Sequence, residues 1–297
     1  MVFAALSILS KLINIIPLPV LAVLAQGLGL LIYYCVPYRK WLILMQMEKA
    51  LGTELDKKAI RALARKNYIH YASVFFESMI LAAQRPEDPT YFNIHTSFQN
   101  REILDAALAE HKGVIIIGGH VGCWEAMGGM VGRFFAPVTV AVKLVNSPAL
   151  QKFREHMQRQ PGVTLIDSRM GRRRVVLLLN ALRKGEMLGI FLDQYRTGEP
   201  FAPFFGHAAR TNSTAALLHI KTGAPVVQLH CIRERLGFFR LELDAVDITG
   251  IDLTASDAVV RLNTVFNTSL EGAVRRHPDQ WLWAHRRFKD NPDFQYN

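Results

Sequence analysis

The first apolar pattern in the chain is a run without charge. No charged residue occurs between Lys11 and Arg39, and the run is rich in Leu, Ile, Val and Ala. Pro17 and Pro19 interrupt it early, which leaves residues 18–34 as a continuous apolar helix. A helix that spans a bilayer needs about 20 apolar residues, so this segment is only marginally long enough to cross a membrane.

The residues that follow this run are typical of a membrane interface. They combine aromatic with basic side chains: Tyr33, Tyr34, Tyr38, Arg39, Lys40 and Trp41. Positive charge at such a boundary indicates that this end of the segment faces the cytoplasm. A cleaved signal peptide would begin with basic residues and end at small ones, whereas here the first charge is Lys11 and bulky residues follow the run. We therefore expect residues 1–41 to be an uncleaved membrane anchor or a re-entrant segment.

A long amphipathic helix is predicted next. Thr53 and Asp56 resemble a capping box, and apolar residues recur at near-helical spacing as far as Ala83. The proline-containing segment 85–89 ends the pattern. The apolar stripe of this helix favours packing against a core.

Beyond residue 100, short apolar runs alternate with helical segments. Strands are predicted at 114–117, 138–142, 163–166, 187–192, 226–231 and 239–246, the last of them more exposed, and helices at 100–112, 174–183, 212–221 and 256–276. The unbroken run 114–117 is typical of a strand buried on both faces. The alternation predicts an α/β fold with a single mixed, mostly parallel sheet flanked by helices. No linker interrupts residues 91–297, so we expect one domain over residues 42–297 behind the anchor at 1–41.

Composition and charge narrow the class of protein. Half of the 297 residues are hydrophobic, and the formal net charge is +10. Such a charge attracts polyanions, including nucleic acid, anionic lipid headgroups and acidic carrier proteins. Nucleic acid is disfavoured, because the sequence has no RNP-like aromatic motif, zinc-finger spacing or basic tail. Three widely spaced cysteines indicate neither a disulfide framework nor a zinc cluster, and favour a reducing compartment.

Two polar clusters follow predicted strands and are candidates for one site, because reactive groups in α/β sheets gather beyond the carboxyl ends of strands. They are residues 118–125 and Asp193-Gln194. The glycines of the first cluster permit a tight turn and close approach of a substrate. An imidazole can take a proton from a hydroxyl near neutral pH, which makes His120 a candidate general base. Glu125 could hold the imidazole of His120 in one tautomer. A His and a Glu at this spacing are, however, also compatible with a structural role for His120.

Four blocks follow one another along the chain. The first is His120-x-x-x-Trp124-Glu125 after two glycines, and the others are Asp193-Gln194 with residues 203–206, residues 221–227, and the tail 281–289. The first block is similar to the motif of the lysophospholipid acyltransferase superfamily, a His, four residues and an acid. Together, the four blocks resemble the bacterial lipid A biosynthesis acyltransferase family within that superfamily. The resemblance implies a glycerolipid acyltransferase-like fold. It also implies transfer of a fatty acyl group from a thioester to a hydroxyl of a lipid or glycolipid, such as a lipid A precursor.

The resemblance further implies residue roles. His120 would deprotonate the acceptor hydroxyl, which attacks the thioester carbonyl without an acyl-enzyme. Glu125 would orient His120, with Asp193 as the alternative partner. An arginine would bind phosphate or stabilise the oxyanion, and Arg159 is the first candidate and Arg154 the second. The remaining expected substrate contacts are Gly119, Trp124 and Gln194, while Trp281, Trp283 and His285 are expected to be structural.

Several functional questions stay open at the level of sequence. The same base could act on water in a thioesterase or lipid hydrolase, or the chain could be an inactive membrane scaffold. Lipid A precursors, phosphatidylinositol mannosides, and amino-acid or polyene lipids are all possible acceptors. We expect membrane lipids and an acyl carrier protein or acyl-coenzyme A as partners, with no metal, no cofactor and no nucleic acid. We also expect a monomer at the bacterial inner membrane, with its active site on the cytoplasmic face.

Overall fold

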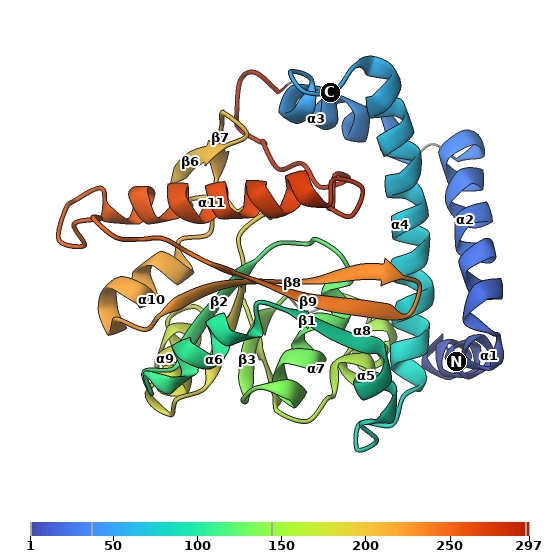
Figure 1. Cartoon of the computed structure of the whole chain (residues 1–297), viewed down its shortest axis with the longest axis horizontal. Helices are drawn as coiled ribbons and strands as arrows, with labels where there is room; N and C mark the ends of the chain where they lie inside the picture. The colour runs from blue at the N-terminus through green and yellow to red at the C-terminus, as the bar shows by residue number, and fades with distance from the viewer. Residues whose placement is uncertain (1, 37, 144, 295, 297) are drawn as a thin grey trace.

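A mixed sheet forms the centre of the molecule (Figure 1). The computed structural model describes residues 2–36, 38–143, 145–294 and 296. Within these residues the sheet has seven strands, in the order β1 (Thr96–Gln99), β9 (Phe238–Ala245), β8 (Val226–Arg235), β2 (Val114–Gly118), β5 (Met187–Phe191), β3 (Val138–Val142) and β4 (Val163–Asp167). Strands β8 and β9 pair antiparallel, and the other neighbouring strands pair parallel. The predicted mixed, mostly parallel sheet is confirmed.

Helices cover both faces of this sheet. One apolar cluster involves α5 (Thr90–His95), α6 (Arg101–Ala109), α7 (Trp124–Phe134) and α8 (Pro148–Gln158). The other involves α9 (Arg172–Arg183), α10 (Thr214–Thr222) and α11 (Ala258–Arg276). Successive side chains of a strand point to opposite faces, so Val114 and Ile116 of β2 join the first cluster and Ile115 and Ile117 the second. This explains the unbroken apolar run of β2.

The amino-terminal helices stand beside the sheet (Figure 1). Helix α1 (Val2–Ile15) leads into α2 (Leu18–Cys35), and α3 (Lys40–Leu51) precedes the long α4 (Lys57–Ala83). Helix α2 runs along α4 so closely that a Cβ on Gly29 would lie 2.5 Å from Ile69 Cα. Helix α2 is long and apolar enough to cross a membrane, and 22% of it is buried in the molecule. The predicted apolar helix is therefore present, whereas the shorter α1 before Pro17 was not expected.

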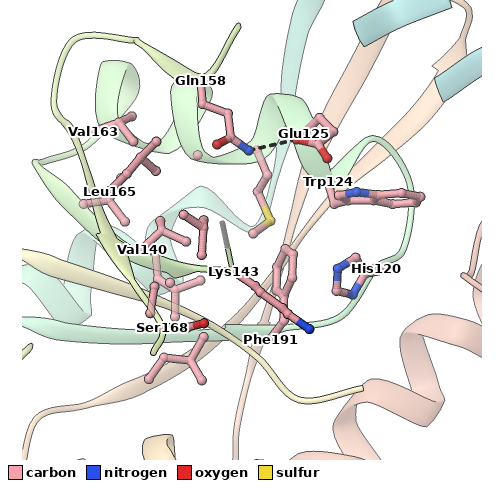
Figure 2. A pocket seen from close by; sticks show the side chains of 18 of the residues that line it. His120, Trp124, Glu125, Val140, Lys143, Gln158, Val163, Leu165, Ser168 and Phe191 are labelled. Carbon is pink, nitrogen blue, oxygen red and sulfur yellow. Dashed lines mark hydrogen bonds between the residues drawn. The ribbon is translucent and has the colours of Figure 1, made fainter. Parts of the chain in front are cut away.

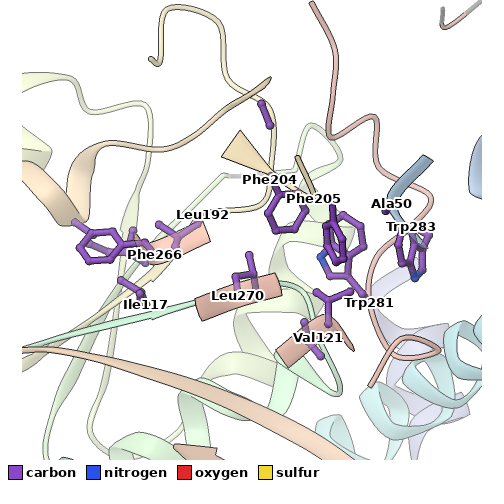
Figure 3. Packing of buried hydrophobic residues seen from close by; sticks show 14 of the residues in the cluster. Ala50, Ile117, Val121, Leu192, Phe204, Phe205, Phe266, Leu270, Trp281 and Trp283 are labelled. Atoms are coloured by element: carbon purple, nitrogen blue, oxygen red, sulfur yellow. The ribbon is translucent and has the colours of Figure 1, made fainter. Parts of the chain in front are cut away.

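Three local features differ from the sequence predictions. Asp56 is itself the N-cap of α4, since its Oδ1 accepts a hydrogen bond from Ala59 N at 2.7 Å, so Thr53 is not the cap. Strand β9 is mostly buried, because β1 pairs with its outer edge and α6 packs on it. An unpredicted hairpin, β6 (Phe201–Phe204) and β7 (His207–Arg210), packs against α11. Its Phe204 and Phe205 meet Trp281 and Leu270 in the core (Figure 3).

Candidate active site

The loop between β2 and α7 is shaped by glycine. Gly122 has a φ of 71°, and a Cβ there would lie 2.0 Å from Cys231 O, so no other residue fits. A Cβ on Gly119 would lie 3.0 Å from Asp193 Oδ2. These two glycines let the loop carrying His120 press against β8 on one side and Asp193 on the other. The predicted tight turn is therefore present.

Asp193 is the hydrogen-bonded partner of His120. Its Oδ1 lies 2.8 Å from His120 Nδ1, and its Oδ2 accepts hydrogen bonds from His120 N at 2.7 Å and Trp281 Nε1 at 2.9 Å. The side chain of Asp193 is 2% exposed and that of His120 14%. A fully buried carboxylate thus fixes the ring through one nitrogen.

The carboxyl group of Asp193 is held in its ionised form. Burial raises its pKa, but the charge of His120 and the hydrogen bonds from His120 and Trp281 outweigh burial and place the pKa well below its ordinary value. An ionised Asp193 favours a proton on His120 Nδ1 and leaves Nε2 as the basic nitrogen. Gln194 Nε2 lies 3.2 Å from that second nitrogen.

Glu125 occupies a different position from the one expected. It lies in the first turn of α7, and its Oε2 accepts a hydrogen bond from Gln158 Nε2 of α8 at 2.9 Å (Figure 2). Among the described contacts, none joins Glu125 to His120. The reason is that the chain has already entered α7 at Trp124, and the first turn directs Glu125 towards α8. Of the two expected partners of His120, the structure brings Asp193 and not Glu125 into hydrogen-bond contact with the ring.

A cavity of about 570 Å³ adjoins His120. This volume is within the usual range for a small-molecule site. It lies between strands β3 and β4 and helices α7 and α8, with His120 and Trp124 on one side and Val140, Val163 and Leu165 on the other (Figure 2). Much of its lining is apolar, including Leu81, Phe92, Met127, Val131, Val138 and Met157. Five cationic side chains also line it: Lys143, Arg154, Arg169, Arg174 and Arg196.

The expected substrate-binding residues divide between the cavity and the surface. Trp124 and Gln194 line the cavity, and the Trp124 ring packs edge-on against His120 at 5.4 Å between centroids. Arg154 also lines it, with Nη1 donating to Lys143 O at 3.0 Å. Arg159, the first candidate, is exposed beyond the end of α8 and is absent from the described lining. Of the two arginines, the structure brings only Arg154 to the site.

Two residues of the carboxyl-terminal tail that we expected to be structural lie at the candidate site. Trp281 donates to Asp193, and His285 lines the cavity while its Nε2 accepts from Tyr195 N at 2.9 Å. Burial lowers the pKa of His285 to about 4, so the ring is neutral at neutral pH. The signal in the sequence was the tail block 281–289, which carried the resemblance without indicating these contacts.

No group of three or more His, Cys, Asp or Glu side chains is placed to hold a metal ion in the part of the chain that the structure describes. Cys123 is buried beside the His120 loop, and burial raises the pKa of its thiol well above the ordinary value. It is therefore a neutral thiol rather than a thiolate nucleophile.

Fold and site together define an α/β protein with a His–Asp pair beside a largely apolar cavity. The chain belongs to the bacterial lipid A biosynthesis acyltransferase family, whose profile it matches over residues 1–290. The lipid A biosynthesis palmitoleoyltransferase of Escherichia coli is 28% identical over 194 residues, which cover 64% of this chain and 60% of the relative. A phosphatidylinositol mannoside acyltransferase of Mycobacterium tuberculosis is 27% identical over 191 residues, covering 60% and 55%. The matches thus span about three fifths of these relatives.

Proposed function

We propose that this protein transfers a fatty acyl group from a thioester donor to a hydroxyl of a glycolipid, with His120 as general base. The observation that carries the proposal is the position of His120, whose Nδ1 is fixed by buried Asp193 and whose ring lines the cavity. The family supports acyl transfer, and the two named relatives support a glycolipid acceptor.

In the proposed reaction, His120 Nε2 takes the proton of the acceptor hydroxyl as its oxygen bonds to the thioester carbonyl carbon. The carbonyl oxygen becomes an oxyanion, and Arg154 and Gln194 are its candidate donors. Collapse of this intermediate breaks the carbon–sulfur bond, and the departing thiolate takes the proton back from Nε2. Asp193 stays ionised throughout and stabilises the imidazolium.

The cavity lining supports a donor that combines an apolar chain with phosphate. The apolar side chains between β3 and α7 suit the acyl chain, and the five cationic side chains suit a phosphate-bearing group. Acyl carrier protein and coenzyme A both present the thioester on phosphopantetheine, so either donor fits. The mechanism requires neither a metal nor a cofactor, and we propose that the protein acts as a monomer.

The amino-terminal helices support a membrane location. Helices α1 and α2 expose large apolar side chains, including Ile8, Leu12, Ile15, Val23 and Leu31. Exposed apolar surface of this extent is typical of a membrane contact. We place the protein at the bacterial inner membrane, with the cavity open to lipid and donor from the cytoplasmic face.

An acyl-transfer assay on purified membranes tests the proposal. Labelled acyl carrier protein and acyl-coenzyme A donors are offered to lipids extracted from the host, with wild type beside His120→Ala. We expect an acylated glycolipid from wild type and a loss of at least about 10³-fold in the variant. Free fatty acid without acylated lipid would identify a hydrolase, and no turnover from either donor would contradict catalysis.

A further inference from the structure

The carboxylate of Asp193 has a second side-chain donor besides His120. We propose that Trp281 is a positioning residue, whose indole N–H locks Asp193 in the orientation that holds His120. The inference rests on the proposed function and adds a residue that acts through Asp193.

The hydrogen bonds of Asp193 leave it little freedom. Oδ1 faces His120 Nδ1, while Oδ2 accepts from both His120 N and Trp281 Nε1. Rotation of the carboxylate would break all three bonds. With 2% of the side chain exposed, water cannot replace a lost donor, and an unmade hydrogen bond to a buried charge costs far more than one at the surface. The indole N–H therefore fixes the plane of the carboxylate.

The backbone of the tail is joined to the His120 loop. Trp281 forms an antiparallel bridge with Val121, Leu282 N donates to His120 O at 3.1 Å, and Gly122 N donates to Gln280 O at 3.0 Å. The indole ring packs against Phe204 and Trp283 (Figure 3). Backbone and ring together aim Nε1 at Asp193.

The opposite side of the tail is held by the amino-terminal helices. Asn67 of α4 donates from Nδ2 to Asp279 O and Trp281 O, both at 2.8 Å. Gln46 of α3 donates from Nε2 to Trp283 O at 2.6 Å and His285 O at 2.8 Å. Both amide side chains are fully buried. Helix α4 thus holds Trp281 directly, and α3 holds the tail just beyond it.

Trp283 provides a matched control. Trp281 and Trp283 are both almost fully buried and each donates one indole hydrogen bond. The acceptor for Trp283 is Pro278 O, at 2.7 Å, and not a carboxylate. Phenylalanine at either position removes the same volume and the same donor and keeps an aromatic ring beside the other tryptophan, so the main difference between the two variants is the bond to Asp193.

The first experiment compares Trp281→Phe with Trp283→Phe in the full chain. We expect kcat of Trp281→Phe to fall about 10- to 100-fold with KM for donor and acceptor within about threefold. The acidic limb of kcat against pH should move to higher pH, because a carboxylate that loses a donor holds the proton of its remaining partner more tightly. Trp283→Phe should lose less than about threefold in kcat and keep the pH profile. Equal kcat values and profiles for the two variants would overturn the inference.

A second variant separates the hydrogen bond from the shape of the side chain. Benzothienylalanine, placed at position 281 alone, keeps a Trp-like shape and replaces the N–H by sulfur. We expect it to reproduce the loss in kcat and the shifted limb of Trp281→Phe while unfolding at the wild-type temperature. Wild-type kcat in this variant would show that packing alone matters and would overturn the role of the N–H.

A third readout is independent of acyl transfer. The measured quantity is the pH dependence of the NMR signals of the His120 ring, in detergent and without substrate. It should differ from wild type in Trp281→Phe but not in Trp283→Phe. If wild type transfers no acyl group and this difference persists, the proposed function fails and the inference stands. If wild type is active and the titrations of both variants match, the inference fails alone.

Discussion

His120 lies between two walls of the site, each of which carries one carboxylate. The two carboxylates differ in burial and in the number of hydrogen bonds that they accept. Asp193, on the wall formed by β5 and the tail, is 2% exposed and accepts three hydrogen bonds. Glu125, on the wall formed by α7 and α8, is half-buried, lines the cavity and accepts one bond from an amide. The first wall fixes the base, whereas the second faces the space for substrate. Groups on the first should control rate, and groups on the second should control which substrate reacts.

Strand register explains why Asp193 meets His120. Strands β2 and β5 run parallel with Gly118 opposite Phe191. His120 and Asp193 each lie two residues beyond these positions, so they leave neighbouring strand ends side by side. Glu125 is nearer in sequence but already belongs to α7. Adjacency of strand ends is therefore a better guide to the pairing than the spacing between His120 and Glu125.

The largest expected effect comes from removing the charge on the first wall. Asp193→Asn keeps the shape but loses the anion that fixes the tautomer of His120, and we expect kcat to fall about 10³- to 10⁴-fold. The measurement is single-turnover acyl transfer with saturating donor. A loss in rate below about tenfold would contradict the idea that the first wall controls the rate and the second wall the choice of substrate.

Gly128 tests the second wall by size. It lines the cavity one turn after Trp124, and a Cβ there would meet nothing within 4 Å. In Gly128→Leu we expect kcat/KM for the longest accepted acyl chain to fall about 200-fold relative to a donor four carbons shorter, since each of the four lost methylene contacts is worth about 0.8 kcal/mol. Gly128→Ala should give a smaller change in the same direction. An unchanged chain-length profile in the Leu variant would remove Gly128 from the acyl site.

Glu125→Gln should have a smaller effect on rate than either of these. The amide keeps the contact with Gln158 and removes a charge that is not bonded to His120. We expect kcat/KM to fall by about tenfold or less, with the pH profile unchanged. A loss equal to that of Asp193→Asn would place Glu125 in the chemistry and make the walls equivalent.

Much of the fold could be predicted because its elements carry local patterns. Short apolar runs between helical segments indicate three of its strands: Val114–Gly118, Val138–Val142 and Met187–Phe191. The bond from Trp281 to Asp193 could not be predicted in this way, since it joins positions 88 residues apart. A buried tryptophan gives the same sequence signal whether its N–H meets a carboxylate or a backbone carbonyl, as the contrast between Trp281 and Trp283 shows.

The choice between Arg154 and Arg159 gives the smallest expected effect on kcat and depends on where helix α8 ends. Helix α8 ends at Gln158, so Arg159 is exposed, whereas Arg154 lies one turn earlier and lines the cavity. If Arg154 binds a phosphate of donor or acceptor and leaves the oxyanion to Gln194, Arg154→Ala should raise the corresponding KM about tenfold with little change in kcat, whereas a fall in kcat would assign Arg154 to the oxyanion. Arg159→Ala has the same change in charge and should match wild type, which controls for the general attraction of anions to a basic protein. The opposite order of effects would show that phosphate is bound outside the cavity, and the second wall would then select the acyl chain alone.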